Sequence, residues 1–240
     1  MDTDLVSQVA YSPADSYDPD LIENAVAEAV RSLGGWQRFV RPGMTVLLKP
    51  NMLSPRHPDK AVTTHPELVA AVARQVKARG ARVLVGDSPS AVKWEIEKVW
   101  RETGLWERAQ DEGFELINFE ASGSQSVAID TRVFHVARPV LEADLVINLP
   151  KLKTHTLTLL SGALKNMYGA IPGFRKAIWH KSAPRPRDFS QVIVDVFSAV
   201  QPQLTIMDAV VAMEGDGPSA GRPYKLGAVL ASADAVAVDT

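Results

Sequence analysis

The sequence contains no cysteine, so its 240 residues hold no disulfide, no thiolate zinc site and no cysteine-ligated iron–sulfur cluster. No apolar run approaches the roughly 20 residues of a membrane-spanning helix. The N-terminal residues lack the basic start and apolar core of a secretory signal. Glycine-rich phosphate-binding motifs and the G-x-S-x-G nucleophile motif are absent as well. We therefore expect a cytoplasmic location and no membrane partner.

The composition is that of an ordinary globular protein, with 46% hydrophobic and 22% charged residues. The net charge of −2 and the sequence pI near 6.2 argue against a dedicated nucleic-acid-binding protein. The length suits one α/β domain over residues 1–240. A helical pattern that starts at Asp234 has no room to finish before Thr240, so we expect the chain to be truncated at the C-terminus.

Apolar runs alternate with helical patterns along the chain, which is typical of βαβ units and a parallel sheet. Strands are predicted at 6–11, 44–48, 82–86, 114–119, 144–149, 204–207 and 226–231. Helices are predicted at 21–33, 64–80, 92–100 and 192–200, the second with a capping box formed by Thr64 and Glu67. Residues 127–129 and 133–136 predict a hairpin. The predicted fold is α/β, a mostly parallel open sheet with helices on both faces and a small β-hairpin insertion.

Polar side chains follow four of the predicted strands, at Lys49–Asn51, Asp87–Ser88, Lys151–His155 and Asp208. Ligands of open α/β sheets sit beyond the carboxyl ends of the strands. We therefore expect a composite site at this edge. The alternative is that the acidic and basic groups only pair with one another, or form ordinary turns.

The stretch from Leu145 to Arg187 holds eight Lys or Arg residues and no acidic residue. Such a local positive field usually faces an anion. Pro150 is predicted to end a strand and to begin a loop in which Lys151, Lys153 and His155 alternate. His155 is a candidate for proton transfer, for donating to an anion or for ligating a metal. A solvated surface loop is the competing interpretation.

The predicted site residues fall into three groups. The catalytic candidates are His155, Lys153 and Asp87, and the ligand-binding candidates are Lys49, Asn51, Ser88, Lys151, Lys165 and Asn166. A divalent cation is the candidate cofactor, with Asp87, Glu214 and Asp216 as metal ligands, because hard cations prefer carboxylate oxygens. Gly162 and Gly169 flank the Lys165–Asn166 pair and permit close backbone approach.

Several segments together resemble the domain-of-unknown-function 362 family. They are Lys49–Asn51, Thr64–Pro66, Gly86–Pro89, Asn148–His155, Leu164–Gly169, Glu214–Pro218 and Ser232–Asp239. Longer members of that family often carry a cysteine-rich, ferredoxin-like segment with iron–sulfur clusters. Because this sequence has no cysteine, the resemblance does not carry cluster binding over to it. A more distant likeness to the nickel-dependent racemase family serves only as an analogy.

The preferred hypothesis is an uncharacterised enzyme or enzyme-like domain that binds a small anion, phosphate or carboxylate, at the carboxyl edge of the sheet. One alternative, from the resemblance, is a redox-associated module whose iron–sulfur partner is another protein or a missing segment. A second is a nucleic-acid binder through residues 151–187, where Phe174 and Trp179 interleave with Arg175, Lys176 and Lys181. The negative net charge argues against this second alternative.

Overall fold

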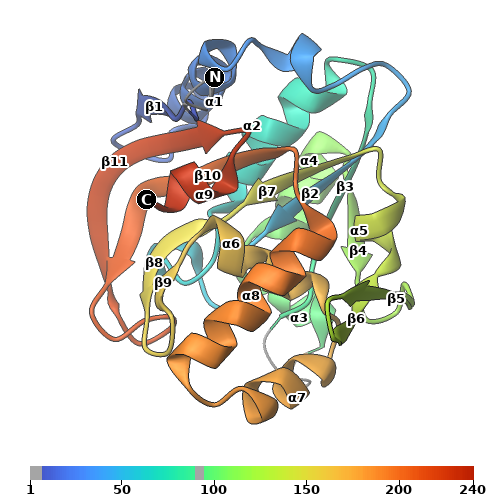
Figure 1. The fold of residues 1–240 in the computed structure, drawn as a ribbon. Coiled ribbons are helices and arrows are strands. Elements are labelled where there is room, and N and C mark those ends of the chain that lie inside the picture. The colour runs from blue at the N-terminus through green and yellow to red at the C-terminus, as the bar shows by residue number, and fades with distance from the viewer. Residues whose placement is uncertain (1–6, 90–94) are drawn as a thin grey trace, which may run out of the picture.

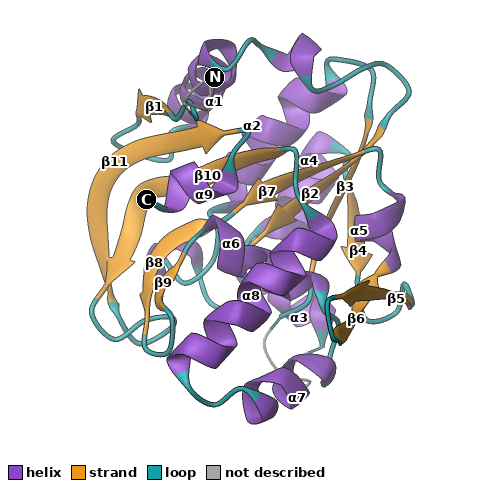
Figure 2. Cartoon of the chain, viewed as in Figure 1, coloured by secondary structure: helices purple, strands orange, loops and turns teal. Residues whose placement is uncertain are grey.

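The computed structural model describes residues 7–89 and 95–240, with a central sheet that has helices on both faces (Figure 1). Within those residues the strand order is β1-β11-β10-β7-β2-β3-β4, and β8 joins β10 to β9 (Figure 2). The bounds are β1 Ala10–Pro13, β2 Thr45–Pro50, β3 Arg82–Asp87, β4 Glu115–Asn118, β7 Leu145–Leu149, β8 Lys151–His155, β9 Leu159–Ser161, β10 Leu204–Glu214 and β11 Arg222–Ser232. The pairs from β10 to β4 are parallel. Strand β11 pairs antiparallel with β10 on one side and with β1, at the edge of the sheet, on the other. The predicted mostly parallel sheet is confirmed.

Two sets of helices bury opposite faces of this sheet. On one face lie α1 Pro19–Ser32, α2 Pro66–Lys77, α3 Ile96–Glu102 and α4 Leu105–Glu112. On the other lie α5 Arg138–Glu142, α6 Ala163–Asn166, α7 Arg175–Ser182, α8 Pro186–Val200 and α9 Ala235–Asp239. The short 3-10 turns are η1 Trp36–Arg38, η2 Pro58–Lys60 and η3 Met167–Ala170. None of the helices in the described ranges is long and apolar enough to cross a membrane.

Strand β2 shows how the sequence produces this layering. Val46 and Leu48 pack with the core that holds α1 and α2, while Leu47 packs with the core that holds α8. Successive side chains of a strand point to opposite faces. A strand covered on both faces therefore reads as a continuous apolar run, as this one does.

The predicted hairpin is confirmed as β5 Ser124–Ile129 and β6 Arg132–Ala137, which pair antiparallel. Phe134 and Val136 of β6 are fully buried and pack in the same core as α8. The hairpin thus covers part of the second face of the main sheet.

The basic segment after Pro150 is a strand, so the predicted loop is wrong. β8 pairs parallel with β10, with Lys151 opposite Asp208, and antiparallel with β9. Proline removes one ladder donor, but its carbonyl still accepts. The Pro150 carbonyl accepts from the Asp208 N–H at 2.9 Å. Lys151 and Lys153 are consequently buried.

The predicted capping box at α2 is also wrong, because His65 is the N-cap. Its Nδ1 accepts from the Glu67 N–H at 3.2 Å, and Pro66 occupies the first turn, where a missing N–H costs nothing. The Thr64 hydroxyl instead donates to the Leu149 carbonyl at 2.6 Å and accepts from the Asn51 N–H. Thr64 therefore ties the end of β2 to the end of β7.

Other boundaries differ from the predictions. Strand β10 runs to Glu214, well past the predicted end at Met207. It can continue through Asp208 because that carboxylate forms an ion pair with Lys151 of β8. Strand β1 begins at Ala10, and the predicted start at Val6 lies outside the described residues. Val92, the predicted start of the helix at 92–100, also lies outside the described residues. The helix found in this region is α3, Ile96–Glu102.

Candidate functional site

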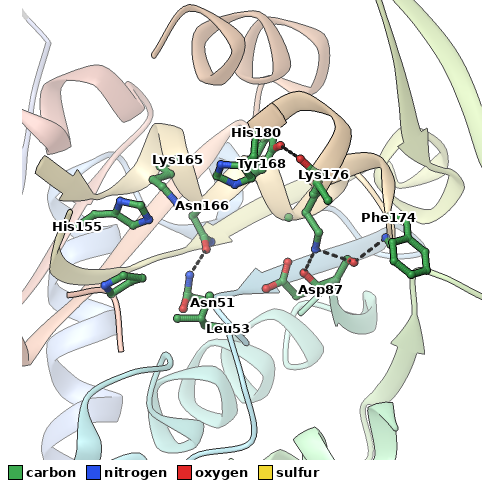
Figure 3. A pocket seen from close by; sticks show the side chains of 15 residues that line it. Asn51, Leu53, Asp87, His155, Lys165, Asn166, Tyr168, Phe174, Lys176 and His180 are labelled. Atoms are coloured by element: carbon green, nitrogen blue, oxygen red, sulfur yellow. Dashed lines mark hydrogen bonds between the residues drawn. The ribbon is translucent and has the colours of Figure 1, made fainter. Parts of the chain in front are cut away.

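A cavity of about 380 Å³ lies at the carboxyl ends of β2 and β3 (Figure 3). The chain beyond β2, the end of β3, the end of β8, α6, η3 and α7 all contribute to its wall. The polar residues that line it are Asn51, Asp87, Ser88, His155, Lys165, Asn166, Lys176 and His180. Tyr168, Phe174 and Leu53 are among its apolar walls. Segments far apart in the sequence therefore meet at the edge where a site was expected.

Six of the predicted site residues line this cavity, namely Asn51, Asp87, Ser88, His155, Lys165 and Asn166. Lys49 and Lys153 lie directly behind the wall, since Lys49 contacts Asp87 and Lys153 contacts Asn51. Lys151, Glu214 and Asp216 are not among the lining residues. The Glu214–Pro218 loop reaches the cavity only through Pro218.

Lys49 and Asp87 form a buried ion pair at the ends of β2 and β3. Lys49 Nζ lies 2.8 Å from Asp87 Oδ1, and the two side chains are 0% and 4% exposed. Asp87 Oδ2 accepts from the Met52 N–H at 2.9 Å. Burial lowers the pKa of Lys49, and the carboxylate beside it opposes that effect. The carboxylate that faces the cavity is thus already balanced by a cation.

Gly169 lies against this pair. A Cβ built on it would lie 2.0 Å from Asp87 Oδ1 and 2.8 Å from Lys49 Nζ, so no larger residue fits. Its carbonyl accepts from the Ser88 N–H at 3.2 Å. Gly162 plays the equivalent part just before α6, where a Cβ would lie 2.0 Å from Asp239 Oδ1. The close backbone approach predicted for both glycines is present.

Lys151 belongs to a separate buried cluster. Its Nζ lies 3.0 Å from Asp208 Oδ2 and donates to the Tyr17 hydroxyl at 2.8 Å, while that hydroxyl donates to Asp208 Oδ1. The Tyr17 ring stacks on His65 at 3.6 Å between centroids. Burial lowers the pKa of Lys151 and outweighs the effect of Asp208. Through these contacts, the side chain of Lys151 links β8, β10 and the N-terminal segment.

A chain of side-chain amides links four segments behind the cavity. Lys153 Nζ donates to Asn51 Oδ1 at 3.0 Å, and Asn51 Nδ2 donates to Asn166 Oδ1 at 3.1 Å. Asn166 Nδ2 in turn donates to Asn148 Oδ1 at 2.8 Å and to the Lys49 carbonyl. Buried polar groups require such partners. Lys153 therefore orients the Asn51 amide from behind, and burial holds the pKa of Lys153 well below its usual value.

Two lysines line the cavity itself. Burial lowers the pKa of Lys165 and of Lys176 to about 8; the nearby charge of Lys49 lowers that of Lys165 further, and Asp87 opposes the shift in both. Lys176 Nζ donates to the Ser88 carbonyl, to Ser88 Oγ and to the Pro89 carbonyl. In the described part of the chain, Asp87 is the only acidic residue that lines the cavity. The lining therefore carries an excess of positive charge.

His155 is held as a neutral imidazole. Its Nδ1 accepts from the backbone N–H groups of Leu157 and Thr158, at 3.1 and 3.3 Å, which leaves the ring proton on Nε2. Burial lowers its pKa to about 3, and the charges of Lys165 and Lys153 act in the same direction. At neutral pH the ring carries no charge and donates a hydrogen bond from Nε2–H. Of the three roles predicted for His155, this form suits donation to an anion.

Three lining residues with polar atoms in their side chains, Lys176, His180 and Tyr168, are not among the predicted site residues. In the sequence, Lys176 belongs only to the nucleic-acid alternative and Tyr168 only to a family motif, while no pattern singles out His180. His180 stacks on Phe189 at 4.1 Å and meets Tyr168 edge-on, so its orientation depends on α8 and η3. The one available sequence signal was the absence of acidic residues from the segment that carries all three.

The predicted metal ligands do not come together. Glu214 pairs with Arg222 at 2.8 Å, Asp216 is exposed in the following turn, and Asp87 is paired with Lys49. Among residues 7–89 and 95–240 there is no group of three or more His, Cys, Asp or Glu that fits a metal ion. Because the chain also has no cysteine, its residues do not fit the iron–sulfur clusters of longer family members.

The sequence is 33% identical over 236 residues to the thylakoid-associated protein sll1697 of Synechocystis sp., an alignment that covers 98% of this chain and 73% of that protein. The structure is similar to the lactate racemase apoprotein from Thermoanaerobacterium thermosaccharolyticum, with a TM-score of 0.56 and 10% identity. That alignment covers 97% of this chain and 56% of the racemase chain, so the chain spans little more than half its length. At this identity the likeness shows a shared fold and nothing about activity.

A family model adds the remaining comparison. The model described as Domain of unknown function (DUF362) matches residues 46–240, which include nearly all of β2 and the whole of β3, β8, α6 and α7, the elements around the cavity. The match covers most of the chain, and the resemblance identified from the motifs is confirmed. The chain therefore belongs to the DUF362 family.

Proposed function

We propose that the cavity binds a small anion of the phosphate or carboxylate class, and that the chain is an enzyme or enzyme-like domain acting on it. The observation that carries this proposal is the charge of the lining. Lys165 and Lys176 face one acidic residue, Asp87, which Lys49 already neutralises. Cavities lined by one sign of charge concentrate ligands of the opposite sign.

The geometry supports different roles for the lining residues toward a bound anion. The Lys165 ammonium provides the charge, and the Nε2–H of His155 donates a hydrogen bond from the end of β8. Lys153 and Asn166 hold the Asn51 amide at the wall. Tyr168 and Phe174 provide apolar surface beside these groups. Hydrogen bonds to a charged group are about twice as strong as neutral ones, so preorganised donors favour the ionised ligand.

Thermal unfolding in the presence of orthophosphate and a panel of small carboxylates tests the proposal. An anion at 100 times its dissociation constant stabilises the folded chain by about 2.7 kcal/mol, which a rise in melting temperature reports. We expect at least one anion to raise the melting temperature of the wild type. Lys165→Met should lose that response, because it removes the cation from the wall.

Lys181→Met is the matched control. Lys181 lies in the same basic stretch between Leu145 and Arg187, but it is exposed and does not line the cavity. It should respond as the wild type does. The proposal is refuted if no anion shifts the wild type, or if Lys165→Met responds as strongly as the control.

The two alternatives gain less support. For nucleic acid, Lys151, Lys153 and Lys176 are buried and bonded to protein groups, which removes them from the predicted basic surface. The redox-associated alternative rests on the family resemblance alone. A cytoplasmic location stays part of the proposal, while the name of the Synechocystis relative associates that protein with the thylakoid.

A further inference from the structure

The amines around the cavity differ in how far they are already engaged. Lys176 makes three hydrogen bonds, one for each of its ammonium protons. Lys49 is paired with Asp87, and Lys153 donates to Asn51 and to a backbone carbonyl. Within residues 7–89 and 95–240, Lys165 is the one lysine lining the cavity that has no hydrogen bond or ion pair. Its amine is therefore free to meet a ligand.

The surroundings of Lys165 favour the unprotonated amine. It is largely buried, and the ammonium of Lys49 is close enough to disfavour a second positive charge. With a pKa of about 8, roughly a tenth of the side chain is a neutral amine at pH 7, which is several hundred times more than for a lysine at 10.5. Burial and a neighbouring cation are the usual means of activating a nucleophilic lysine.

A hydrogen-bond donor lines the same cavity. His155 is fixed with its proton on Nε2, because two backbone N–H groups occupy Nδ1. Figure 3 shows His155 and Lys165 on neighbouring parts of the wall. A neutral imidazole can polarise a carbonyl oxygen without losing its proton. While Lys165 is a neutral amine, the ammonium of Lys176 keeps the lining positive, because Lys49 balances Asp87. The cavity thus combines a free amine, a donor suited to a carbonyl oxygen and an excess of positive charge.

We propose that Lys165 forms a Schiff base with the carbonyl carbon of a small 2-oxo acid held in this cavity. This inference rests on the proposed anion binding and narrows its ligand to a carboxylate with an adjacent carbonyl. The amine attacks the carbonyl carbon, and the carbinolamine then loses its oxygen as water. An ammonium and a carbonyl yield a protonated imine and one water, so atoms and charge balance. The donor on His155 stabilises the oxygen while it carries negative charge.

Borohydride trapping tests the proposal directly. The full chain is incubated with 2-oxobutyrate and sodium borohydride, then analysed by intact mass and peptide mapping. We expect one reduced adduct per chain, located on the peptide that contains Lys165. Lys165→Arg should not be trapped, because guanidinium does not form the imine, and Lys181→Arg should be trapped as the wild type is.

The 2-hydroxy analogue separates this inference from the anion site on which it rests. 2-Hydroxybutyrate has the same carboxylate but no carbonyl, so it should stabilise the fold and give no adduct. If both acids stabilise the chain and neither is trapped at Lys165, the Schiff base is refuted and the anion site stands. If the adduct spreads over exposed lysines such as Lys60 and Lys181, the reaction is unspecific and the inference fails. If neither acid binds, the carboxylate site itself is refuted.

Discussion

The buried pair of Lys49 and Asp87 should make the fold sensitive to the removal of either partner. Their charged atoms are 2.8 Å apart and almost fully withdrawn from water. At an effective dielectric constant of about 20, unit charges at that distance attract by about 6 kcal/mol, and the lost hydration of both groups offsets much of this. Removing one partner leaves the other charge buried alone, which typically costs about 3–5 kcal/mol.

We expect Lys49→Met to lower the free energy of unfolding by about 3–5 kcal/mol at pH 7, because Asp87 would keep only the Met52 N–H as a donor. Asp87→Asn should cost less. Burial already lowers the pKa of Lys49, so its side chain can release a proton when the carboxylate is gone. The double variant should lose less than the sum of the two, with a coupling of about 2–3 kcal/mol.

Equilibrium urea unfolding, followed by tryptophan fluorescence, measures all four corners of this cycle. The matched control is the pair of Arg82 and Glu115 on the neighbouring strands, which is 63% and 51% exposed. A solvated pair of that kind should couple by less than about 1 kcal/mol. The reasoning is refuted if the Lys49–Asp87 coupling stays below about 0.5 kcal/mol, or does not exceed that of the control.

Two further predictions concern the same cavity. The free energy of unfolding should rise between pH 8 and 10, because the pKa values of Lys165 and Lys176 are about 8 when folded and 10.5 in their unperturbed state, so the unfolded chain binds more protons in that interval. Urea titrations should show a shallower rise for Lys165→Met, and a wild-type profile that falls would contradict the assignment. Gly169→Ala should unfold at lower urea than Gly215→Ala, since its Cβ would overlap Asp87, whereas that of Gly215 meets nothing within 4 Å and only its positive φ is strained. Equal midpoints would show that Gly169 has room for a side chain.

Local pattern was sufficient to predict most of the fold. The apolar runs that became β2, β3 and β7 are short, bounded by polar residues and separated by helical patterns, which is what a parallel sheet covered on both faces requires. The errors came where an interaction beyond the local segment decided the outcome. The carbonyl of Pro150 accepts from the distant Asp208, and so the chain continues as β8.

The meeting of these polar side chains at one edge was likewise predictable, because the carboxyl ends of parallel strands converge there whatever their order. The chemical state of each lysine was not. Lys49 and Asp87 meet because β2 and β3 are neighbours, while Lys153 reaches an asparagine 102 residues earlier in the sequence. Nothing in their local sequence distinguishes these lysines from Lys165.

By itself, the sequence determined an α/β fold, the family and a positive segment at one edge of the sheet. The fold follows from periodicity, the positive segment from local composition and the family from the order of the motifs, and none of these requires tertiary contacts. Tertiary structure alone decided that Lys49 and Lys151 are paired with carboxylates, that Lys153 is used behind the wall, and that Lys165 stays free in the cavity. The physical reason is that a buried ammonium is costly without a partner, and the order of the strands selects which lysines have one.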